Sequence, residues 1–508
     1  MTESQTRYVP KKIKKLLVAN RGEIAVRVMR TCKELGIKTV AIYSEADRGA
    51  LHVQTADEAY CVGEAPSRDS YLKIDKIIDV AIHSKVQAIH PGYGFLSENA
   101  TFAEACADAG LIFVGPSPES IRSMGDKTTA RLMMEKAGVP MAPGTPDAID
   151  DPTEAVHIAE EIGYPVLIKA AAGGGGKGMR LVEDPSTFLS SIEMAQREAE
   201  SAFGDGRVFI EKYITQPRHI EFQVLRDHFG TGVHLFEREC SIQRRHQKVV
   251  EEAPSCVLTP EIRKKMGEAA VRAAEECGYT NAGTVEFLID GDLNFYFMEM
   301  NTRLQVEHPV TEMITGKDLV VEQIRIAEGE PLGYTQDDLT INGHSIECRI
   351  YAEDVRSNFL PSPGPLHLHR PPAGPGVRVD AGVDITGEIP IHYDPMISKL
   401  MVHAPSRIEA IEKMIRALDE YTVAGVSTTI PFCRFAMAHE AFRSGNFSTH
   451  FVQRYFDPSA LDEANKELEY AAALAAVLHH HESAASAGVN QPEEDQVQES
   501  PWRKRAWM

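Results

Sequence analysis

Apolar runs and amphipathic stretches alternate along the first quarter of the chain. The runs at residues 16–19, 39–43, 88–90 and 112–114 are too short for helices, and helical patterns lie between them. This alternation predicts parallel strands joined by helices. We therefore expect an α/β domain at the start of the chain.

Residues 299–307 follow a different pattern, because every second position carries a charged or amide side chain that can bind a ligand or take part in a reaction. If the chain is extended there, two carboxylates, two amides and a guanidinium point to one side. Asn and Glu are poor strand formers, so this face favours a divalent metal together with a small anion. A solvated edge strand of mixed charge is the alternative. The aligned residues are Glu299, Asn301, Arg303, Gln305 and Glu307.

A predicted β-hairpin leads into this segment. Two apolar, aromatic-rich runs flank Asp290 and Gly291, which form a common hairpin turn. If the connecting loop has an even number of residues, Glu286 and Glu299 share a face roughly 5–8 Å apart. Two carboxylates this close repel unless a cation or a proton lies between them, which favours magnesium. An acid/base pair of the glycosidase type is the alternative, but it leaves the glycine-rich loop upstream unexplained.

That glycine-rich loop follows a short apolar run that ends at Lys169. Five glycines fall within residues 173–178, and glycine lets backbone N–H groups approach an anion closely. The spacing is not that of a P-loop, and no helical pattern follows as in a dinucleotide-binding turn. A flexible loop is the alternative, whereas Lys169 favours a mobile loop that covers phosphates. Residues 208–214 are predicted as a strand with charged residues at its end, which suits a purine edge.

The amino-acid composition limits the kinds of molecule that the protein is expected to bind. The chain has 508 residues, 43% of them apolar, and a net charge of -21, which predicts several domains and argues against nucleic-acid or anionic membrane surfaces. The basic residues 244–248 are the one candidate nucleic-acid patch, and the overall charge argues against that interpretation. Eight scattered cysteines without a CxxC pair predict reduced thiols and no zinc site. With no apolar signal or membrane-spanning run, we expect a cytoplasmic protein.

These features, in this order, resemble the ATP-grasp enzymes, and within them the biotin carboxylase component of biotin-dependent carboxylases. The resemblance covers about residues 14–456. The motifs that carry it are Ala19–Ala25, His90–Asn99, Met124–Lys127, Gln243–Pro254, Glu299–Pro309 and Glu347–Arg349. It implies an α/β fold that begins with a Rossmann-like N-terminal domain at 11–125. An ATP-grasp domain follows at 126–335, with a mobile glycine-rich lid at about 141–214. An α+β C-terminal domain at 340–458 and a helical, then disordered tail at 460–508 account for the rest of the chain.

The resemblance also implies a reaction and a role for each matching residue. In the family, ATP with Mg²⁺ or Mn²⁺ activates bicarbonate as carboxyphosphate, and the carboxyl group then moves to biotin. The nucleotide-binding positions are Lys127, Lys169, Gly173, Gly174, Gly175, Gly176, Gly178, Glu211, Lys212, Tyr213, His219, Gln243 and His246. The residues that match the family's metal ligands are Glu286, Glu299 and Asn301. The bicarbonate site matches Lys248, Arg303, Gln305 and Val306, and the base matches Glu307. The biotin side matches Tyr93, Phe95 and Arg349, of which Arg349 stabilises the biotin enolate.

Partners follow from the same resemblance. No Ala-Met-Lys-Met-like biotinyl-lysine motif occurs in the sequence, so we expect biotin on a separate carrier protein and one or more carboxyltransferase subunits; the family suggests a homodimer. Residues 20–23 resemble a nucleotide-binding turn, but the family assigns them no nucleotide, and they are not predicted as site residues. The favoured activity is the first half-reaction of acetyl-CoA carboxylase, which supplies malonyl-CoA for fatty acid synthesis.

Several alternatives remain open. The same half-reaction could serve a propionyl-CoA, another acyl-CoA or a pyruvate carboxylase. Another ATP-grasp ligase that joins a carboxylate to an amine is a more distant alternative. A non-catalytic scaffold would be expected to have lost some of the residues that carry the chemistry. Glu286, Glu299, Glu307 and Arg349 are all present, which argues against a scaffold.

Overall fold

The computed structural model describes residues 11–145, 148–171, 179–245, 247–384 and 387–461, and positions 474, 477 and 478. It forms two compact units, residues 1–455 and 456–508. The architecture below is that of the first unit. The predicted nucleotide contacts Gly173 to Gly178 and His246 lie outside the described residues, as does nearly all of the predicted tail. No helix among the described residues is long and apolar enough to cross a membrane.

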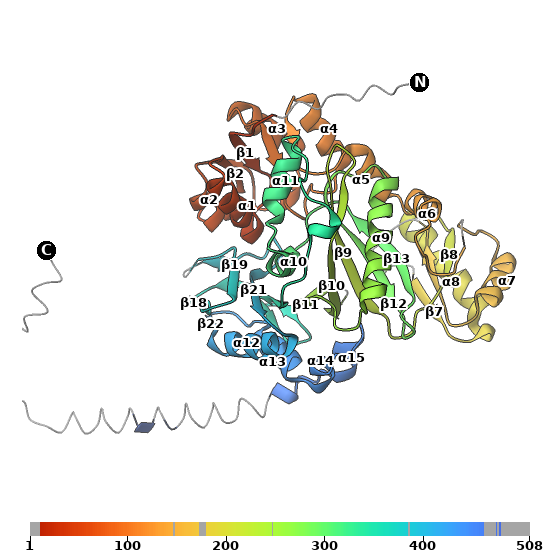
Figure 1. Cartoon of the computed structure of the whole chain (residues 1–508). Coiled ribbons are helices and arrows are strands. Elements are labelled where there is room, and N and C mark those ends of the chain that lie inside the picture. The colour runs from red at the N-terminus through yellow and green to blue at the C-terminus, as the bar shows by residue number, and fades with distance from the viewer. Residues whose placement is uncertain are drawn as a thin grey trace, which may run out of the picture. The chain divides into compact units, whose positions relative to one another are not determined.

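The N-terminal part is a five-stranded parallel sheet flanked by helices (Figure 1). The strand order is β3-β2-β1-β4-β5, and every pairing is parallel. The predicted α/β fold is confirmed, and β3, a half-exposed edge strand, adds to the predicted strands. The elements are β1 Lys15–Val18, α1 Gly22–Glu34, β2 Lys38–Ser44, α2 Leu51–Thr55, β3 Glu58–Gly63, α3 Ile74–His83, β4 Ala88–His90, α4 Ala100–Asp108, β5 Ile112–Phe113 and α5 Pro118–Gly125.

An eight-stranded antiparallel sheet forms the centre of the molecule. Its order is β13-β12-β9-β10-β11-β14-β21-β19, and β11 pairs with β14. One sheet therefore crosses the predicted domain boundary near residues 335–340. The strands are β9 Arg218–Arg226, β10 Gly232–Arg244, β11 Gln247–Ala253, β12 Asn281–Ile289, β13 Phe295–Asn301, β14 His344–Tyr351, β19 Val377–Ala381 and β21 Met396–Ala404. Helices near it include α6 Lys127–Lys136, α9 Pro260–Glu276, α10 His308–Thr315, α11 Leu319–Ala327, α12 Arg407–Glu420 and α13 Ile430–Ala438.

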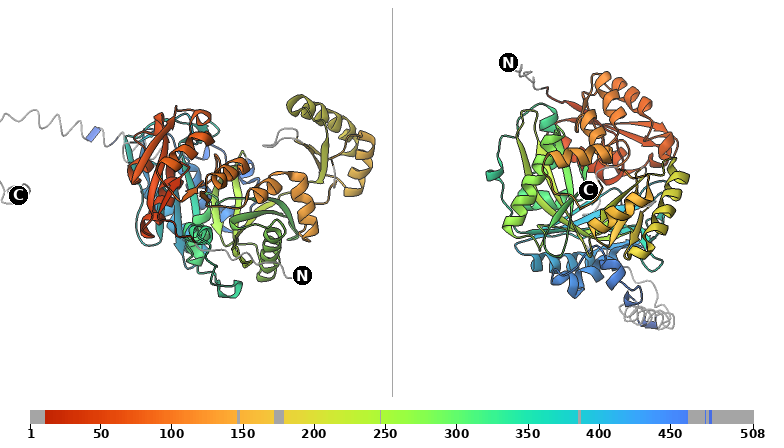
Figure 2. Two further views of the ribbon diagram at one scale, coloured as in Figure 1. Left: turned by 90° about the horizontal axis from the view of Figure 1, so that it is seen from above. Right: turned by 90° about the vertical axis from the view of Figure 1, so that its right-hand side faces the viewer.

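A separate three-stranded antiparallel sheet lies in the predicted lid. Its order is β7-β6-β8, and apolar side chains of two helices pack with it in one buried cluster. Figure 2 (left) shows this layer standing apart from the eight-stranded sheet. The predicted strand at 208–214 ends at Lys212. The elements are α7 Pro152–Ile162, β6 Val166–Ala170, β7 Met179–Val182, α8 Phe188–Phe203 and β8 Val208–Lys212.

The predicted hairpin is confirmed, but its register has a different origin from the one expected. Residues 290–294 connect β12 to β13, an odd number, which by itself would place Glu286 opposite residue 298. A register shift between Glu286 and Phe287 brings Glu299 opposite Glu286 instead. This irregularity is a β-bulge, which re-aims side chains near functional sites.

The prediction that residues 299–307 are extended throughout is wrong beyond Asn301. The strand β13 ends at Asn301, the chain turns, and α10 begins at His308 with Pro309 in its first turn. Proline suits that position because its missing N–H and fixed φ cost nothing there. Glu307 is therefore positioned as the residue before a helix, with φ -80° and ψ 9°, and not by strand alternation.

Candidate active site

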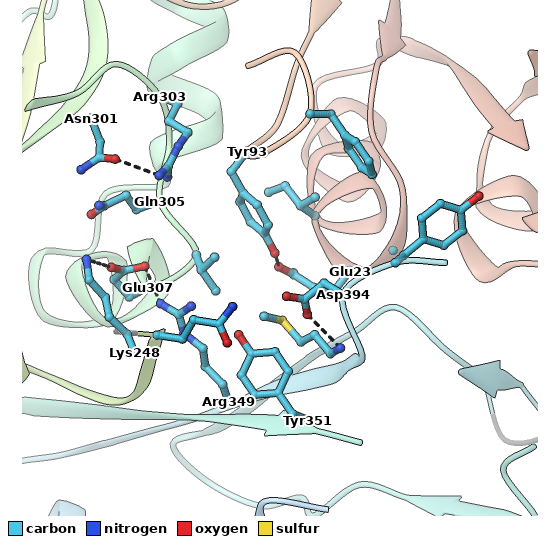
Figure 3. A pocket seen from close by; sticks show the side chains of 18 of the residues that line it. Glu23, Tyr93, Lys248, Asn301, Arg303, Gln305, Glu307, Arg349, Tyr351 and Asp394 are labelled. Carbon is cyan, nitrogen blue, oxygen red and sulfur yellow. Dashed lines mark hydrogen bonds and ion pairs between the residues drawn. The ribbon is translucent and has the colours of Figure 1, made fainter. Parts of the chain in front are cut away.

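A cavity of about 1050 Å³ gathers most of the predicted site residues. Its walls come from the N-terminal sheet, the central sheet and the turn before α10 (Figure 3). The predicted residues that line it are Tyr93, Phe95, His219, Gln243, Lys248, Glu286, Glu299, Asn301, Arg303, Gln305, Val306, Glu307 and Arg349. Residues far apart in sequence thus meet on one concave surface.

A row of carboxylates crosses three strands at this surface and ends at an arginine on a fourth. Glu299 on β13 lies opposite Glu286 on β12, Glu286 lies opposite Glu221 on β9, and Glu221 lies opposite Arg238 on β10. Residues directly opposite each other share a face of a sheet. Arg238 is fully buried and its Nε donates to Glu221 Oε1 at 2.6 Å, so the row ends in a compensating cation.

Lys248 connects this row to the turn before α10. Its Nζ lies 2.5 Å from Glu221 Oε2, 2.9 Å from Glu286 Oε1 and 2.6 Å from Glu307 Oε1. Burial opposes ionisation of Glu286 and Glu307, but the Lys248 ammonium holds the pKa of both carboxyl groups well below the ordinary value. Both groups are therefore carboxylates at neutral pH. The same carboxylates, despite the burial of Lys248, hold the pKa of its ammonium well above 10.5.

Glu307 is held from a second side by Arg349. The Arg349 Nη2 lies 2.9 Å from Glu307 Oε2, and its Nε lies 2.6 Å from Glu251 Oε1. Figure 3 shows Glu307 between Lys248 and Arg349. A carboxylate with two cations is a weak base, because its proton affinity is low. An anion that draws those cations to itself would restore the basicity of Glu307.

The carboxylate row has the composition of a divalent cation site. Burial, followed by the charge of Glu286, raises the pKa of Glu299, which is the repulsion expected of two adjacent carboxyl groups. His219 Nε2 lies 3.0 Å from Glu286 Oε2, and Asn301 Nδ2 donates to Glu286 Oε1 at 2.9 Å. Carboxylate and amide oxygens at this density fit Mg²⁺.

Arg303 and Gln305 stand beside this row with donors of their own. Arg303 Nη2 donates to Asn301 Oδ1 at 2.8 Å, and Gln305 Nε2 donates to Glu286 Oε1 at 2.7 Å. A planar guanidinium next to an amide is suited to a small planar oxyanion. Glu307 follows Gln305 in the same turn, so an anion held there would lie near a carboxylate base.

Several predicted nucleotide contacts lie away from this cavity. Lys169 and Glu211 form an ion pair within the three-stranded sheet. Lys212 Nζ donates to the carbonyl oxygens of Gly163 and Tyr164 at 2.8 and 2.9 Å. Lys212 and Tyr213 line a second cavity of about 610 Å³, and Lys127 begins α6. The structure therefore does not bring these lysines, Glu211 and Tyr213 together with the carboxylate row.

Several residues in and around the site were not predicted. Glu221 and Arg238 hold the row together, and their signal is the alternation of His219, Glu221 and Gln223 along β9, which repeats the pattern at residues 299–301. Residues 20–23 were not predicted as site residues, and all of them line the cavity. Asn20 Nδ2 donates to the Tyr93 carbonyl at 2.8 Å, and Glu23 accepts a hydrogen bond from the Tyr93 hydroxyl.

Comparisons with known proteins agree with this geometry. Residues 126–335 match the model of the carbamoyl-phosphate synthase L chain ATP-binding domain. Residues 12–121 and 347–454 match the biotin carboxylase N-terminal and C-terminal domains. The chain is thus an enzyme of the ATP-dependent ligase class, as predicted.

Individual relatives are similar over almost the whole first unit. The chain is 58% identical over 442 residues to a pyruvate carboxylase subunit from Methanothermobacter thermautotrophicus, covering 87% of this chain and 90% of that one. It is 57% identical to the biotin carboxylase of Nostoc sp., covering 87% and 99%. The chain therefore belongs to the biotin carboxylase family, as its sequence predicted.

Solved structures show the same likeness. The biotin carboxylase domain dimer of 2-oxoglutarate carboxylase from Hydrogenobacter thermophilus, in complex with MgADP, ADP and bicarbonate, has a TM-score of 0.82 at 51% identity, over 88% of this chain and 98% of that one. The Campylobacter jejuni biotin carboxylase complex with β-γ-ATP has a TM-score of 0.83 at 49% identity, over 87% and 99%.

Proposed function

We propose that this enzyme uses MgATP and bicarbonate to carboxylate biotin through carboxyphosphate. The observation that carries the proposal is the position of Lys248, whose ammonium contacts both Glu286 in the carboxylate row and Glu307 in the turn before α10. One cation thereby joins a site suited to a metal-bound phosphate and a site suited to a small oxyanion. Transfer of a phosphoryl group to bicarbonate requires these two sites to adjoin.

Glu286, Glu299 and Asn301 would hold the metal, which offsets the charge that develops on the transferred phosphoryl group. His219 and Gln243 would contact the nucleotide, and Gln243 Nε2 lies 3.1 Å from His219 Nδ1. We assign the remaining nucleotide contacts to the lid residues Lys169, Glu211, Lys212 and Tyr213, the glycines 173–176 and 178, and Lys127 and His246.

Arg303, Gln305 and the Val306 backbone would hold bicarbonate, with Lys248 on its other side. Bicarbonate would compete with Glu307 for Lys248 and Arg349. Loss of these cationic partners raises the proton affinity of Glu307, so the base gains strength as its substrate binds. Glu307 then removes the bicarbonate proton as the phosphoryl group is transferred.

Tyr93, Phe95 and Arg349 line the cavity, and we assign them to its biotin side. The guanidinium of Arg349 keeps its charge throughout the reaction and would stabilise the enolate that forms on the ureido group of biotin. We further propose that biotin arrives on a separate carrier protein, that carboxyltransferase subunits accept the product, and that the chain is a homodimer. The structure of the Hydrogenobacter thermophilus relative is a dimer.

The acceptor that we favour is acetyl-CoA, which would place the enzyme in acetyl-CoA carboxylase and fatty acid synthesis. Similarity to stand-alone biotin carboxylases such as the Nostoc protein, which the chain matches over 99% of its length, supports this assignment. Pyruvate is the second candidate, because a relative at 58% identity belongs to a pyruvate carboxylase. The two acceptors can be distinguished by combining the enzyme with the carrier protein and carboxyltransferase of each system and measuring carboxylation of acetyl-CoA and of pyruvate.

The half-reaction itself is tested by ADP release from the purified chain. We expect release with MgATP to require bicarbonate and to rise when free biotin is added. Release that ignores bicarbonate would contradict the proposal and favour a ligase that joins a carboxylate to an amine.

A further inference from the structure

Lys399 is a buried cation that the proposed reaction does not use. It lies on β21, has no exposed surface, and stands opposite Arg349 on β14 and Asp380 on β19. Arg349 and Lys399 therefore share one face of the sheet. Burying an ammonium group costs free energy unless it is paired and hydrogen-bonded, so the contacts of Lys399 indicate what it stabilises.

The first contact reaches the turn that carries Glu307. Lys399 Nζ donates to the Val306 carbonyl oxygen at 2.8 Å. This carbonyl belongs to the peptide that joins Val306 to Glu307, so the hydrogen bond fixes the orientation of the peptide plane that leads directly into the base. The turn lies between the end of β13 and the start of α10. The backbone hydrogen bonds that pair β13 with β12 in the described sheet end at Asn301 and do not reach it.

The second contact reaches the opposite wall of the cavity. Lys399 Nζ lies 3.2 Å from Glu23 Oε1, and that carboxylate accepts a hydrogen bond from the hydroxyl of Tyr93. Figure 3 shows Tyr93 pointing toward Glu23. Glu23 and Tyr93 both line the cavity. Since Glu23 is buried, removal of its cation would favour protonation and weaken its hold on Tyr93.

We propose that Lys399 is a positioning residue that holds the Val306–Glu307 turn and Tyr93 in a fixed relation, and so aligns the bicarbonate and biotin sides of the cavity. This inference rests on the proposed function. One ammonium contacts both walls, and among the described residues no other lysine or arginine contacts the Glu23 carboxylate. Loss of Lys399 should therefore disturb the two substrates together.

The test compares Lys399→Met, which keeps most of the side-chain volume without the charge, with the wild-type enzyme. We expect the KM for bicarbonate and the KM for free biotin each to rise about tenfold, because small displacements of reacting groups are costly. Affinity for MgADP, measured by calorimetry, should stay near the wild-type value. Unchanged KM values for both substrates in a folded variant would overturn the inference.

Two further variants separate positioning from loss of stability. Arg407→Met removes a partly buried cation of the same part of the fold, one paired with Glu252, and should lower stability without changing either KM. Glu23→Gln keeps the contact between Lys399 and Val306, so it should raise the KM for biotin and leave that for bicarbonate near the wild-type value. Equal rises of both KM values in Arg407→Met would contradict a specific role for Lys399.

Amide hydrogen exchange gives a readout that does not depend on turnover. In Lys399→Met, residues 302–310 and 91–95 should exchange faster than in the wild type, while the five-stranded sheet is unchanged. If the wild type lacks bicarbonate-dependent ADP release but these segments respond, the proposed function fails and the anchoring role stands. If neither segment responds, the anchoring role fails whatever the enzyme catalyses.

Discussion

Glu307 is the residue on which the proposed chemistry depends most directly. Glu307→Gln removes the base with little change in shape, so bicarbonate-dependent ADP release should fall by about 10²–10⁴-fold, the usual contribution of general base catalysis. Calorimetry should show MgADP binding that is little changed, because Glu307, which contacts Lys248, is proposed to act on bicarbonate and not on the nucleotide. Near-normal turnover in this variant would exclude Glu307 as the base.

Two adjacent glutamates on β11 should respond to pH in opposite ways. Burial raises the pKa of Glu251 from 4.5 to about 7, so the folded state binds its proton more tightly than the unfolded state does. Stability from this group therefore falls as pH rises from 4.5 through 7. The change in stability caused by Glu251→Gln should thus be more favourable at pH 8 than at pH 5, by about 1 kcal/mol or more, which melting temperatures at the two pH values would show.

Glu252 is the matched control for this prediction. Although burial opposes ionisation, the hydrogen bond from His344 and the charge of Arg407 lower its pKa from 4.5 to about 2. The stability that it contributes is present above pH 4.5 and is lost as pH falls toward 2. Glu252→Gln should lower the melting temperature at pH 5 and at pH 8 by similar amounts. The same pH dependence for both variants would contradict the assignment.

At the scale of elements, Arg238 joins three strands of the central sheet to α10. Its guanidinium donates to Gln223, Thr311, Thr284 and Gln305 as well as Glu221. Breaking a buried ion pair from one side leaves an unpaired charge, so Arg238→Met should reduce the free energy of unfolding by about 3–5 kcal/mol.

Urea denaturation followed by circular dichroism measures that loss. Arg197→Met is the control, because Arg197 is an exposed residue of α8 that pairs with Glu193 on the same helix, and exposed pairs contribute little. Equal effects of the two substitutions would show that the carboxylate row does not depend on Arg238.

Sequence reasoning found the elements that carry strong local signals. The hairpin at Asp290 and Gly291 and the strand that ends near Lys169 both show clear apolar runs or turn residues. The bulge that sets Glu299 opposite Glu286 has no such signal, because the chain gains its register from the neighbouring strands. The turn before α10 was missed for a related reason: alternation of side-chain chemistry was taken for strand geometry.

The site as a whole was predictable in its residues more than in its arrangement. Motif order identified the family, and the cavity collects the residues that we propose for the metal, the base and biotin. Glu23 and Glu221 were missed because their partners, Tyr93, Lys399 and Lys248, lie far away in sequence. Contacts of this kind come from the packing of whole domains, which no local pattern records.

At the scale of the whole molecule, the first compact unit ends at Tyr455, and the matched family domains end at residue 454. A chain that ends at residue 461 should therefore retain carboxylation of free biotin and its melting temperature. Activity assays and calorimetry on the shortened protein check this. A collapse of activity with intact folding would show that residues after 461 contribute to the active site.

Lys248 makes the two halves of the cavity thermodynamically dependent on each other. A metal that binds Glu286 repels the ammonium from that carboxylate, and an oxyanion beside Glu307 attracts the same ammonium. Binding on one side therefore prepares the other, and by linkage each ligand changes the affinity for its counterpart by one common factor. If the metal-bound nucleotide and bicarbonate bind as proposed, each should therefore strengthen the binding of the other.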